Sequence, residues 1–371
     1  MRTRALTHQV ADEVVDRNRT VDSTKTGSGA PSDDAHAGGA PPDDAHAGGA
    51  HAGGSASAGV PAGSPAIPLG ADVHLLDTRM GGYDGITAAY LLRTSRPALV
   101  ETGAARSAQL VVDELAALGI GREDLATIVV THIHLDHAGG VGDLASAFPN
   151  AEVVVHERGA RHLVDPARLM SSARRVFGDD VMDTVFGELL STPAHRVRAL
   201  GDTGEVDLGD GRRLTSTYSP GHASHHVGLL DSATGDLYVG DAAGIYVPEA
   251  DLVRPATPPP DFDLDLALAS LRTFEQLAPT RLLFSHYGPA AHVEEVLSRS
   301  QDELRLWVEL ARGCRTDGLD LDHAVIAVRD RTRERYAAMA SEDEKWQALS
   351  SDRANLSGIL HWLDRTEPGA C

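Results

Sequence analysis

Three histidines and an aspartate stand close together in the segment HIHLDH at residues 132–137. Alternate residues of an extended segment face the same side, so His132 and His134 can contact one metal ion. Where the chain turns into the glycine-containing loop that follows, Asp136 and His137 can face a neighbouring ion. Imidazole and carboxylate ligands suit zinc, iron or manganese. A single histidine is usually structural, but four potential ligands packed this densely are hard to explain as core, so the motif predicts a metal site.

The residues before this motif predict the element that positions it. Residues 125–131 are apolar and rich in β-branched side chains, which is typical of a buried strand, and they run directly into the motif. A helix is predicted at residues 107–119, because apolar residues recur at i, i+4 and i+7 from Val111. The metal site is therefore expected at the end of a strand, where a loop leaves a rigid scaffold.

The rest of the chain alternates strands and helices. Hairpins in both halves, with helices between them, predict an α/β fold of two mixed β-sheets sandwiched by helices. Two apolar stripes in the last seventy residues predict helices that pack against the core or a partner. The predicted strands are 71–78, 85–94, 97–102, 152–155, two hairpins within 206–218 and 227–240, and 281–285; the predicted helices are a segment within 157–195, 264–277, and the stripes around Trp307 and Ile359.

The HxHxDH spacing at a strand end resembles the signature of the metallo-β-lactamase-fold hydrolases, including the glyoxalase II-like branch. The resemblance covers residues 71 to about 295 and includes three later segments in the family's order. It implies an αββα sandwich that holds two divalent metal ions, zinc first, with iron or manganese as other choices. The later segments are Ser-Pro-Gly-His ending at His222, Val-Gly-Asp ending at Asp241, and Phe-Ser-His-Tyr-Gly-Pro around His286.

The resemblance also assigns a role to each ligand. His222 would join His132 and His134 on the first metal, and His286 would join Asp136 and His137 on the second. Asp241 would bridge both metals and hold the water between them, and Asp136 is assigned to the catalytic centre as well as to the second metal.

Two positions depart from the family pattern. Glu101 stands where the family often has the aspartate of an Asp-Thr-Gly segment, and that position is not a metal ligand in the family. His225 precedes His226 in place of a glycine. These two histidines are expected to orient the ligands rather than to bind metal themselves.

The implied reaction is hydrolysis of a small ester-like bond, in a thioester or a lactone, by a hydroxide between the two metals. The alternative is an iron-dependent redox enzyme of the same fold, persulfide dioxygenase-like or an oxygen-reactive di-iron protein. A third reading is a metal-stabilised scaffold without activity. The chain offers no Gly-x-Ser-x-Gly segment for a serine nucleophile. His156, His162, Tyr246 and Tyr287 are weaker candidates for the substrate pocket.

Composition limits the partners and the location. With 54 acidic and 33 basic residues, the net charge is −21, so the expected partner is a small-molecule substrate and neither nucleic acid nor membrane. The two cysteines, Cys314 and Cys371, form no disulfide framework, which fits a reducing cytoplasm. The N-terminus has no apolar core that would make it a secretory signal.

Three regions are expected. Residues 1–69 carry the repeats APSDDAHAGG and APPDDAHAGG, and predict a disordered tail whose histidines, at positions 36, 46 and 51, could bind metal weakly. Residues 70–298 are the predicted catalytic domain. Residues 299–371 are a predicted helical extension, expected either to cap the pocket or to form a contact between the two copies of a homodimer.

Overall fold

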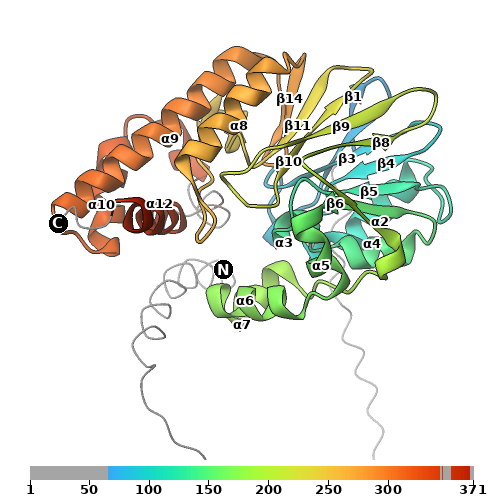
Figure 1. Ribbon diagram of the computed structural model, residues 1–371, viewed down its shortest axis with the longest axis horizontal. Helices are drawn as coiled ribbons and strands as arrows, with labels where there is room; N and C mark the ends of the chain where they lie inside the picture. Colours follow the sequence, from blue (N-terminus) through green and yellow to red (C-terminus); the bar gives the residue numbers. More distant parts are fainter. Residues whose placement is uncertain (1–65, 343–344, 346–351, 368–371) are drawn as a thin grey trace, which may run out of the picture.

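A mixed sheet of seven strands forms the first half of the protein, in a computed structural model that describes residues 66–342, 345 and 352–367. The strands lie in chain order across the sheet (Figure 1). Neighbours are antiparallel from β1 to β4 and parallel from β4 to β7. The strands are β1 Ile67–Gly70, β2 Val73–Asp77, β3 Ala88–Leu92, β4 Ala98–Val100, β5 Thr127–Val129, β6 Glu152–His156 and β7 Val197–Leu200.

A second mixed sheet has six strands in the order β15-β14-β11-β10-β9-β8. Only β11 and β14 run parallel, and the other neighbours are antiparallel. A small hairpin of β12 and β13 stands apart from both sheets. The strands are β8 Thr203–Asp207, β9 Arg213–Tyr218, β10 Val227–Asp231, β11 Asp236–Gly240, β12 Ile245–Val247, β13 Leu252–Arg254, β14 Arg281–Phe284 and β15 Gly288–Ala290.

The two sheets pack face to face over a shared apolar core, because successive strand residues point to opposite faces. Tyr90 of β3, Tyr238 of β11 and Leu283 of β14 point into the space between the sheets. The rings of Tyr90 and Tyr238 meet edge to face at 5.2 Å between centroids. Their neighbours Leu91 and Leu282 point outward to the helices. The alternation buries both faces of each sheet.

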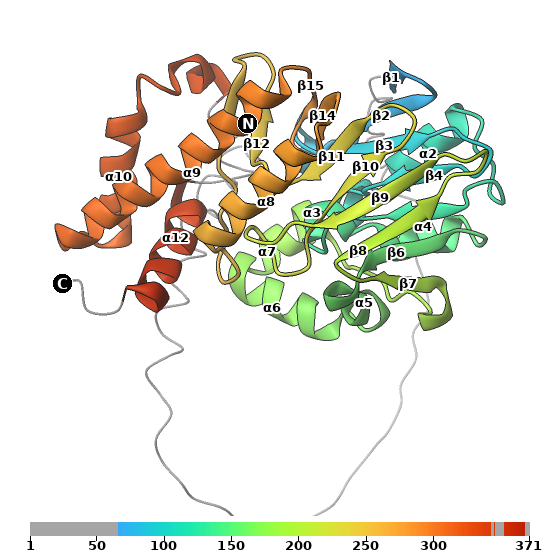
Figure 2. The same cartoon turned by 45° about the horizontal axis from the view of Figure 1, so that its top comes forward.

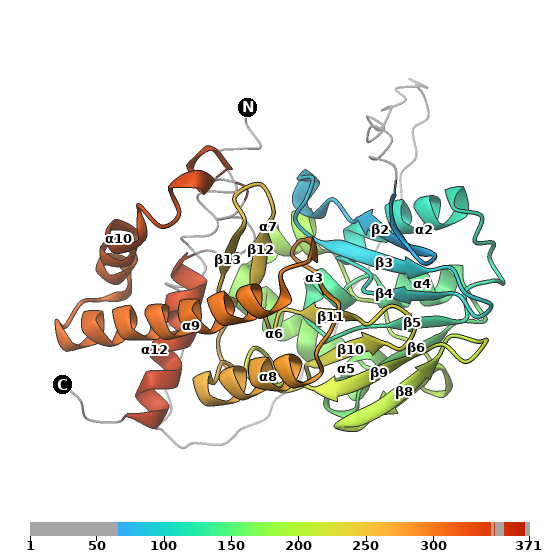
Figure 3. The same cartoon turned by 90° about the horizontal axis from the view of Figure 1, so that it is seen from above.

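Helices cover the two outer faces (Figure 2). On the first sheet they share one core with β3 to β6. On the second sheet they share another core with β11 and β14, and the C-terminal helices gather at one side of it (Figure 3). The predicted αββα sandwich is thus confirmed. The first set is α2 Ala108–Ala117, α3 Leu135–Ala138, α4 Val141–Ala147, α5 Glu157–Val164 and α6 Ala167–Phe177; the second is α8 Leu264–Gln276, α9 Val293–Thr316, α10 Leu321–Thr332 and α12 Asp352–Thr366.

The elements differ from the sequence prediction at the region boundaries. The predicted tail, with its three histidines, lies outside the described residues except for its end, where Ile67–Gly70 forms β1 against β2. Helix α9 runs through residue 298, which was predicted to end the catalytic domain, and packs on α8. The short strands β1, β7, β12, β13 and β15 were not predicted; β4 and β5 are equally short but lie in the predicted strands 97–102 and 125–131.

No helix in the described ranges is both long and apolar enough to cross a bilayer. Of the two cysteines, Cys314 is buried in α9 as a free thiol, and Cys371 lies outside the described residues.

Candidate metal centre

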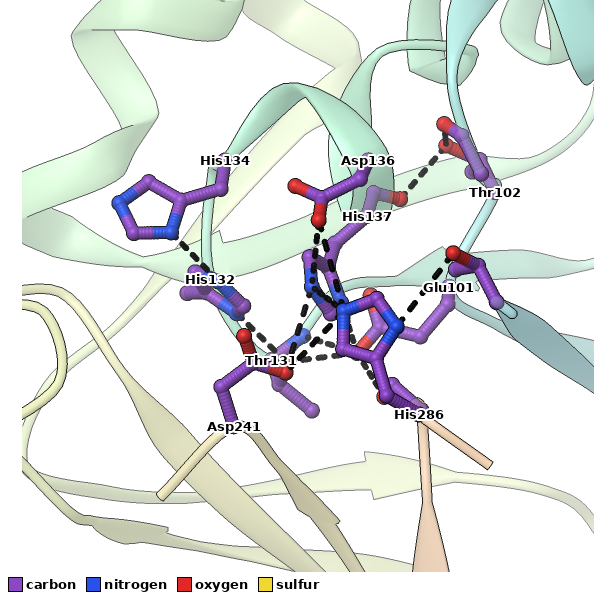
Figure 4. Close-up of polar contacts among 12 residues, drawn as sticks. Glu101, Thr102, Thr131, His132, His134, Asp136, His137, Asp241 and His286 are labelled. Carbon is purple, nitrogen blue, oxygen red and sulfur yellow. Dashed lines mark hydrogen bonds and ion pairs between the residues drawn. The ribbon is translucent and has the colours of Figure 1, made fainter. Parts of the chain in front are cut away.

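The residues predicted as metal ligands follow the carboxyl ends of four strands. The HIHLDH segment leads from β5 into α3, and His222 follows β9. Asp241 and His286 follow β11 and β14 directly or after one residue, and these two strands are parallel, so they end at the same edge of the second sheet. Figure 4 shows the side chains of this edge converging from both sheets.

Three histidines form the first group. Nε2 of His132 lies 3.0 Å from Nδ1 of His134. That same Nδ1 lies 2.9 Å from Nε2 of His222. His132 and His222 are buried, and His134 is half-buried. Three ring nitrogens therefore point at one position.

Asp136, His137 and His286 form the second group. The Nε2 atoms of His137 and His286 are 3.1 Å apart. Oδ2 of Asp136 lies 3.6 Å from Nε2 of His137 and 3.4 Å from Nε2 of His286. Two imidazoles and a carboxylate thus converge on a second position.

Asp241 stands between the two groups, and each of its oxygens faces a different one. Oδ2 lies 3.4 Å from Nε2 of His222 in the first group. Oδ1 lies 3.4 Å from Nε2 of His137 and 3.6 Å from Nε2 of His286 in the second. This is the arrangement that a carboxylate needs to bridge two cations.

The separations within each group fit a metal ion. Ligands at 2.0–2.1 Å from a tetrahedral ion lie about 3.3 Å from one another. The separations given above run from 2.9 to 3.6 Å. The structure therefore brings all seven predicted ligand residues into two adjoining sets of the right size, and their binding of metal stays a prediction.

Hydrogen bonds to the other ring nitrogens fix the orientation of three histidines. Nδ1 of His222 donates to the carbonyl of Ala256 at 3.0 Å, and Nδ1 of His286 donates to that of Ile86 at 2.7 Å. Nδ1 of His132 lies 3.0 Å from Oγ1 of Thr131. Protonation at Nδ1 leaves a lone pair on each Nε2, the atom that points into the site. Sequence reasoning missed these contacts, since main-chain carbonyls carry no residue-type signal.

Glu101 connects both groups from behind. Its Oε1 accepts a hydrogen bond from Oγ1 of Thr131, whose other contact is His132 of the first group. The same oxygen lies 3.8 Å from Nδ1 of His137 in the second group. It also accepts a bond of 3.3 Å from Ser285, the neighbour of His286. One carboxylate therefore supports ligands of both groups. The family pattern implied only that this position is not a metal ligand.

His226 orients Asp241, as the sequence predicted for a non-ligand histidine. Its Nε2 accepts the backbone N–H of Asp241 at 3.1 Å, so Nδ1 carries the proton and donates to Ser219 at 2.8 Å. Gly240 makes this approach possible: a Cβ there would lie 2.4 Å from Nε2 of His226. His225 lies further out, with its Nδ1 3.4 Å from the backbone N–H of Ile133.

Electrostatics separate the two groups. Burial, together with neighbouring histidines, lowers the pKa of His132 and holds that of His134 at about 4. These rings are neutral at pH 7 and free to bind a cation. Burial also lowers the pKa of His137, but the carboxylates of Asp241 and Asp136 outweigh it and raise that pKa well above its usual value. The carboxylates of Asp136 and Asp241 thus attract positive charge, which a metal ion can supply.

The weaker pocket candidates have protein partners. His156 stacks on Tyr218 at 4.8 Å between ring centroids. Tyr246 donates to Asp251 at 3.0 Å, and His162 accepts from Arg161 at 3.1 Å. For Tyr287, the hydroxyl has a raised pKa because the residue is largely buried and lies near Asp77. None of the four belongs to the two groups of candidate ligands.

Comparison with known proteins agrees with the fold. The protein ST1585 from Sulfurisphaera tokodaii, a metallo-beta-lactamase fold-containing protein, is 31% identical over 194 residues, which are 50% of this chain and 71% of ST1585. Its crystal structure superposes with a TM-score of 0.53 at 26% identity, over 64% of this chain and 86% of that one. TTHA1429 from Thermus thermophilus shares the fold, with a TM-score of 0.57 at 22% identity over 80% of this chain and 95% of that one.

A relative named for an activity matches a shorter part of the chain. The N-acyl homoserine lactonase AttM of Azorhizobium caulinodans is 32% identical over 126 residues, which are 32% of this chain and 40% of AttM. The sequence profile of the Metallo-beta-lactamase superfamily matches residues 82–286, more than half of the chain, from the loop after β2 to His286 itself. The chain therefore belongs to the metallo-beta-lactamase superfamily.

Proposed function

We propose that the protein is a dinuclear metal-dependent hydrolase that cleaves a small ester-like substrate, a thioester or a lactone. The observation that carries this proposal is the carboxylate of Asp241, whose two oxygens face two separate sets of ligand atoms. Members of this superfamily are generally metal-dependent hydrolases, and the described residues include His and Asp clusters of metal-binding size.

The proposed first site consists of His132, His134 and His222, and the second of Asp136, His137 and His286, with Asp241 shared. Two divalent cations held here, zinc first, would lower the pKa of a water between them from about 15.7 to about 7 and would polarise a carbonyl oxygen. At the first site the chain presents neutral imidazole nitrogens, which burial and an outer hydrogen bond keep deprotonated on the inner side. At the second site it supplies the carboxylates of Asp136 and Asp241, which attract positive charge.

The choice of a thioester or lactone rests on the ligand order and on two relatives. Besides the lactonase AttM, a hydroxyacylglutathione hydrolase from Synechococcus is 28% identical over 157 residues, 41% of this chain and 47% of that protein. A lactone and a thioester present the same acyl carbon, so one site can act on either. The glyoxalase II-like branch is proposed on this basis. Glutathione itself is left out of the proposed substrate, because the sequence offers no cluster of basic and tyrosine side chains that would bind it.

A redox function is the second candidate. A putative diflavin flavoprotein from Nostoc is 25% identical over 242 residues, which are 60% of this chain and 37% of that protein. The same histidines and carboxylates would suit iron. The bound metal therefore separates the two proposals.

The test is to purify the protein without added metal, to measure its metal content by mass spectrometry, and to assay it after loading with zinc or iron. Zinc-loaded protein should hydrolyse a panel of acyl lactones or thioesters. Hydrolysis of phosphodiesters alone would reject the ester-like substrate. Iron as the native metal, with oxygen or persulfide consumption and no hydrolysis, would establish the redox function instead.

A further inference from the structure

We infer that Asn355, on the last helix of the chain, is a positioning residue for His222. It acts by holding residues 255–257, so that the carbonyl of Ala256 meets the imidazole of His222. The inference rests on the proposed function in one respect, since it takes His222 to be a metal ligand.

The side-chain amide of Asn355 brackets Ala256 on both sides. Its Oδ1 accepts the backbone N–H of Thr257 at 2.9 Å, and its Nδ2 donates to the carbonyl of Pro255 at 3.0 Å. The hydroxyl of Thr257 adds bonds to the carbonyl and the Oδ1 of Asn355, at 3.1 and 3.2 Å. Asn355 and Thr257 are 2% and 0% exposed. Buried hydrogen bonds of this kind hold residues 255–257 in one orientation, because a polar group that loses its hydrogen bond away from water is costly.

The bracketed residue is the partner of the metal-site histidine. The Ala256 carbonyl lies 3.0 Å from Nδ1 of His222. This contact keeps the proton on Nδ1 and turns Nε2 toward His134 and Asp241, at 2.9 and 3.4 Å. A shift of the Ala256 carbonyl would therefore change both the direction of the Nε2 lone pair and the tautomer of the ring.

The helix itself is fixed against this segment at two further points. Asp352, at the start of α12, forms a buried ion pair with Arg254, which precedes the segment, and a partly exposed one with Arg329 of α10 at 2.6 Å. Gly358 lies one turn after Asn355, and a Cβ at that position would approach the carbonyl oxygen of Thr257 to 1.9 Å. The backbones of α12 and of the segment thus approach closely at Gly358, and the ion pair of Asp352 with Arg254 joins them on the other side of Asn355.

Two variants test the inference at different severity. Asn355→Leu keeps the branching of the side chain, with somewhat more volume, but removes both hydrogen bonds of the side-chain amide. Thr257→Val is milder, because it removes only the hydroxyl bonds and keeps the bond from the Thr257 N–H. Leu363→Ala is the matched control: Leu363 is on the same helix and fully buried, but its contacts are with the apolar core. His361→Ala, on the exposed side of α12, controls for substitution on this helix as such.

The first measurement is the hydrogen exchange of the Nδ1 proton of His222, followed by NMR in metal-free protein labelled with ¹⁵N-histidine. The second is Zn²⁺ affinity from chelator competition, fitted with two binding constants. In Asn355→Leu we expect faster exchange of this proton and one zinc constant weakened about tenfold, with the other unchanged. Thr257→Val should show a smaller change in the same direction. Leu363→Ala should lower the Tm without either effect.

Unchanged exchange and unchanged zinc affinity in Asn355→Leu would overturn the inference. So would equal losses in Leu363→Ala at an equal drop in Tm, because the role of Asn355 would then be stability alone. Failure of the proposed function is seen separately. If the wild type binds no zinc, the metal site is rejected, while the exchange rate of the His222 proton still decides whether Asn355 positions that ring.

Discussion

The hydroxyl of Thr131 donates a hydrogen bond of 2.6 Å to Oε1 of Glu101, and both residues are completely buried. Glu101 has a left-handed backbone, with φ of 66°, which a residue with a side chain adopts only when its surroundings impose it. The strain keeps the carboxylate between the two groups of candidate ligands. It lies near His137 of the second group directly and reaches His132 of the first group through Thr131.

Glu101→Gln should weaken zinc binding about tenfold, because the amide oxygen can still accept from Thr131 but the neutral side chain no longer attracts the His137 imidazole. Glu101→Asp keeps the charge and should retain more of the affinity than Gln does. Chelator competition measures both. Equal affinities in the wild type and in Glu101→Gln would show that this carboxylate does not support the ligands.

Asp241→Asn should reduce the zinc content from two ions per chain to one or fewer, and hydrolysis by about a hundredfold or more. The amide nitrogen cannot bind a cation, so only one of the two positions keeps an oxygen ligand. Metal analysis and turnover of a lactone or thioester measure the two effects. Asp210→Asn, the same change on an exposed turn, should alter neither. A variant that still held two zinc ions at wild-type affinity would exclude Asp241 as the bridge.

Glu114→Gln should stabilise the protein at alkaline pH. Burial, with the nearby Asp77, raises the pKa of Glu114 to about 7, from 4.5. The protonated carboxyl therefore favours the fold fully below pH 4.5, and this contribution is lost as the pH rises through 7. Both oxygens are buried and lack a hydrogen-bond partner among the described residues. We expect a gain of about 1–2 kcal/mol in the free energy of unfolding at pH 8, allowing for solvent screening, and none at pH 4.

Urea unfolding of the wild type and of Glu114→Gln at the two pH values checks this. Glu123→Gln, an exposed glutamate in the loop after α2, serves as the control and should be neutral at both. A gain that is the same at pH 4 and pH 8 would mean that titration of Glu114 is not the cause.

Removal of metal should lower the thermal stability of the wild type. A cation that binds the folded chain at a hundred times its dissociation constant adds about 2.7 kcal/mol to the free energy of unfolding. Each group of ligands joins loops from both sheets, so the loss should appear as a lower Tm by calorimetry after dialysis against a chelator. Zinc should restore it. In Asp241→Asn the difference between the loaded and the chelated protein should shrink, and an undiminished difference would count against a shared ligand.

The sequence was sufficient for an α/β fold of two sheets from its periodicity, and for the αββα order and the grouping of the candidate ligands through the resemblance to the metallo-β-lactamase-fold hydrolases. HIHLDH lies at a strand end as predicted, and His222, Asp241 and His286 meet it from the second sheet. The support of these residues could not be predicted. The carbonyls of Ile86 and Ala256 act through backbone atoms, and no spacing in the sequence marks them.

Asn355 illustrates the same limit from another side. It lies 98 residues along the chain from Thr257, which belongs to the segment that Asn355 holds. The apolar stripe of its own helix predicted only packing. The apolar stripe around Trp307 predicted the helix α9, but not that this helix begins at Val293 and shares a core with β14. Long-range pairing decides such contacts, and periodicity reports only on neighbours along the chain.

The chain order of the seven strands in the first sheet has a consequence for synthesis on the ribosome. Each strand pairs with the one made just before it, so this sheet can close progressively as the polypeptide emerges. Strand β14 must instead return to β11, and α12 is among the last elements translated. Residues 132–137 are therefore translated well before Asp241 and His286, the candidate ligands that follow β11 and β14. A chain released early would carry four potential ligands and no complete centre.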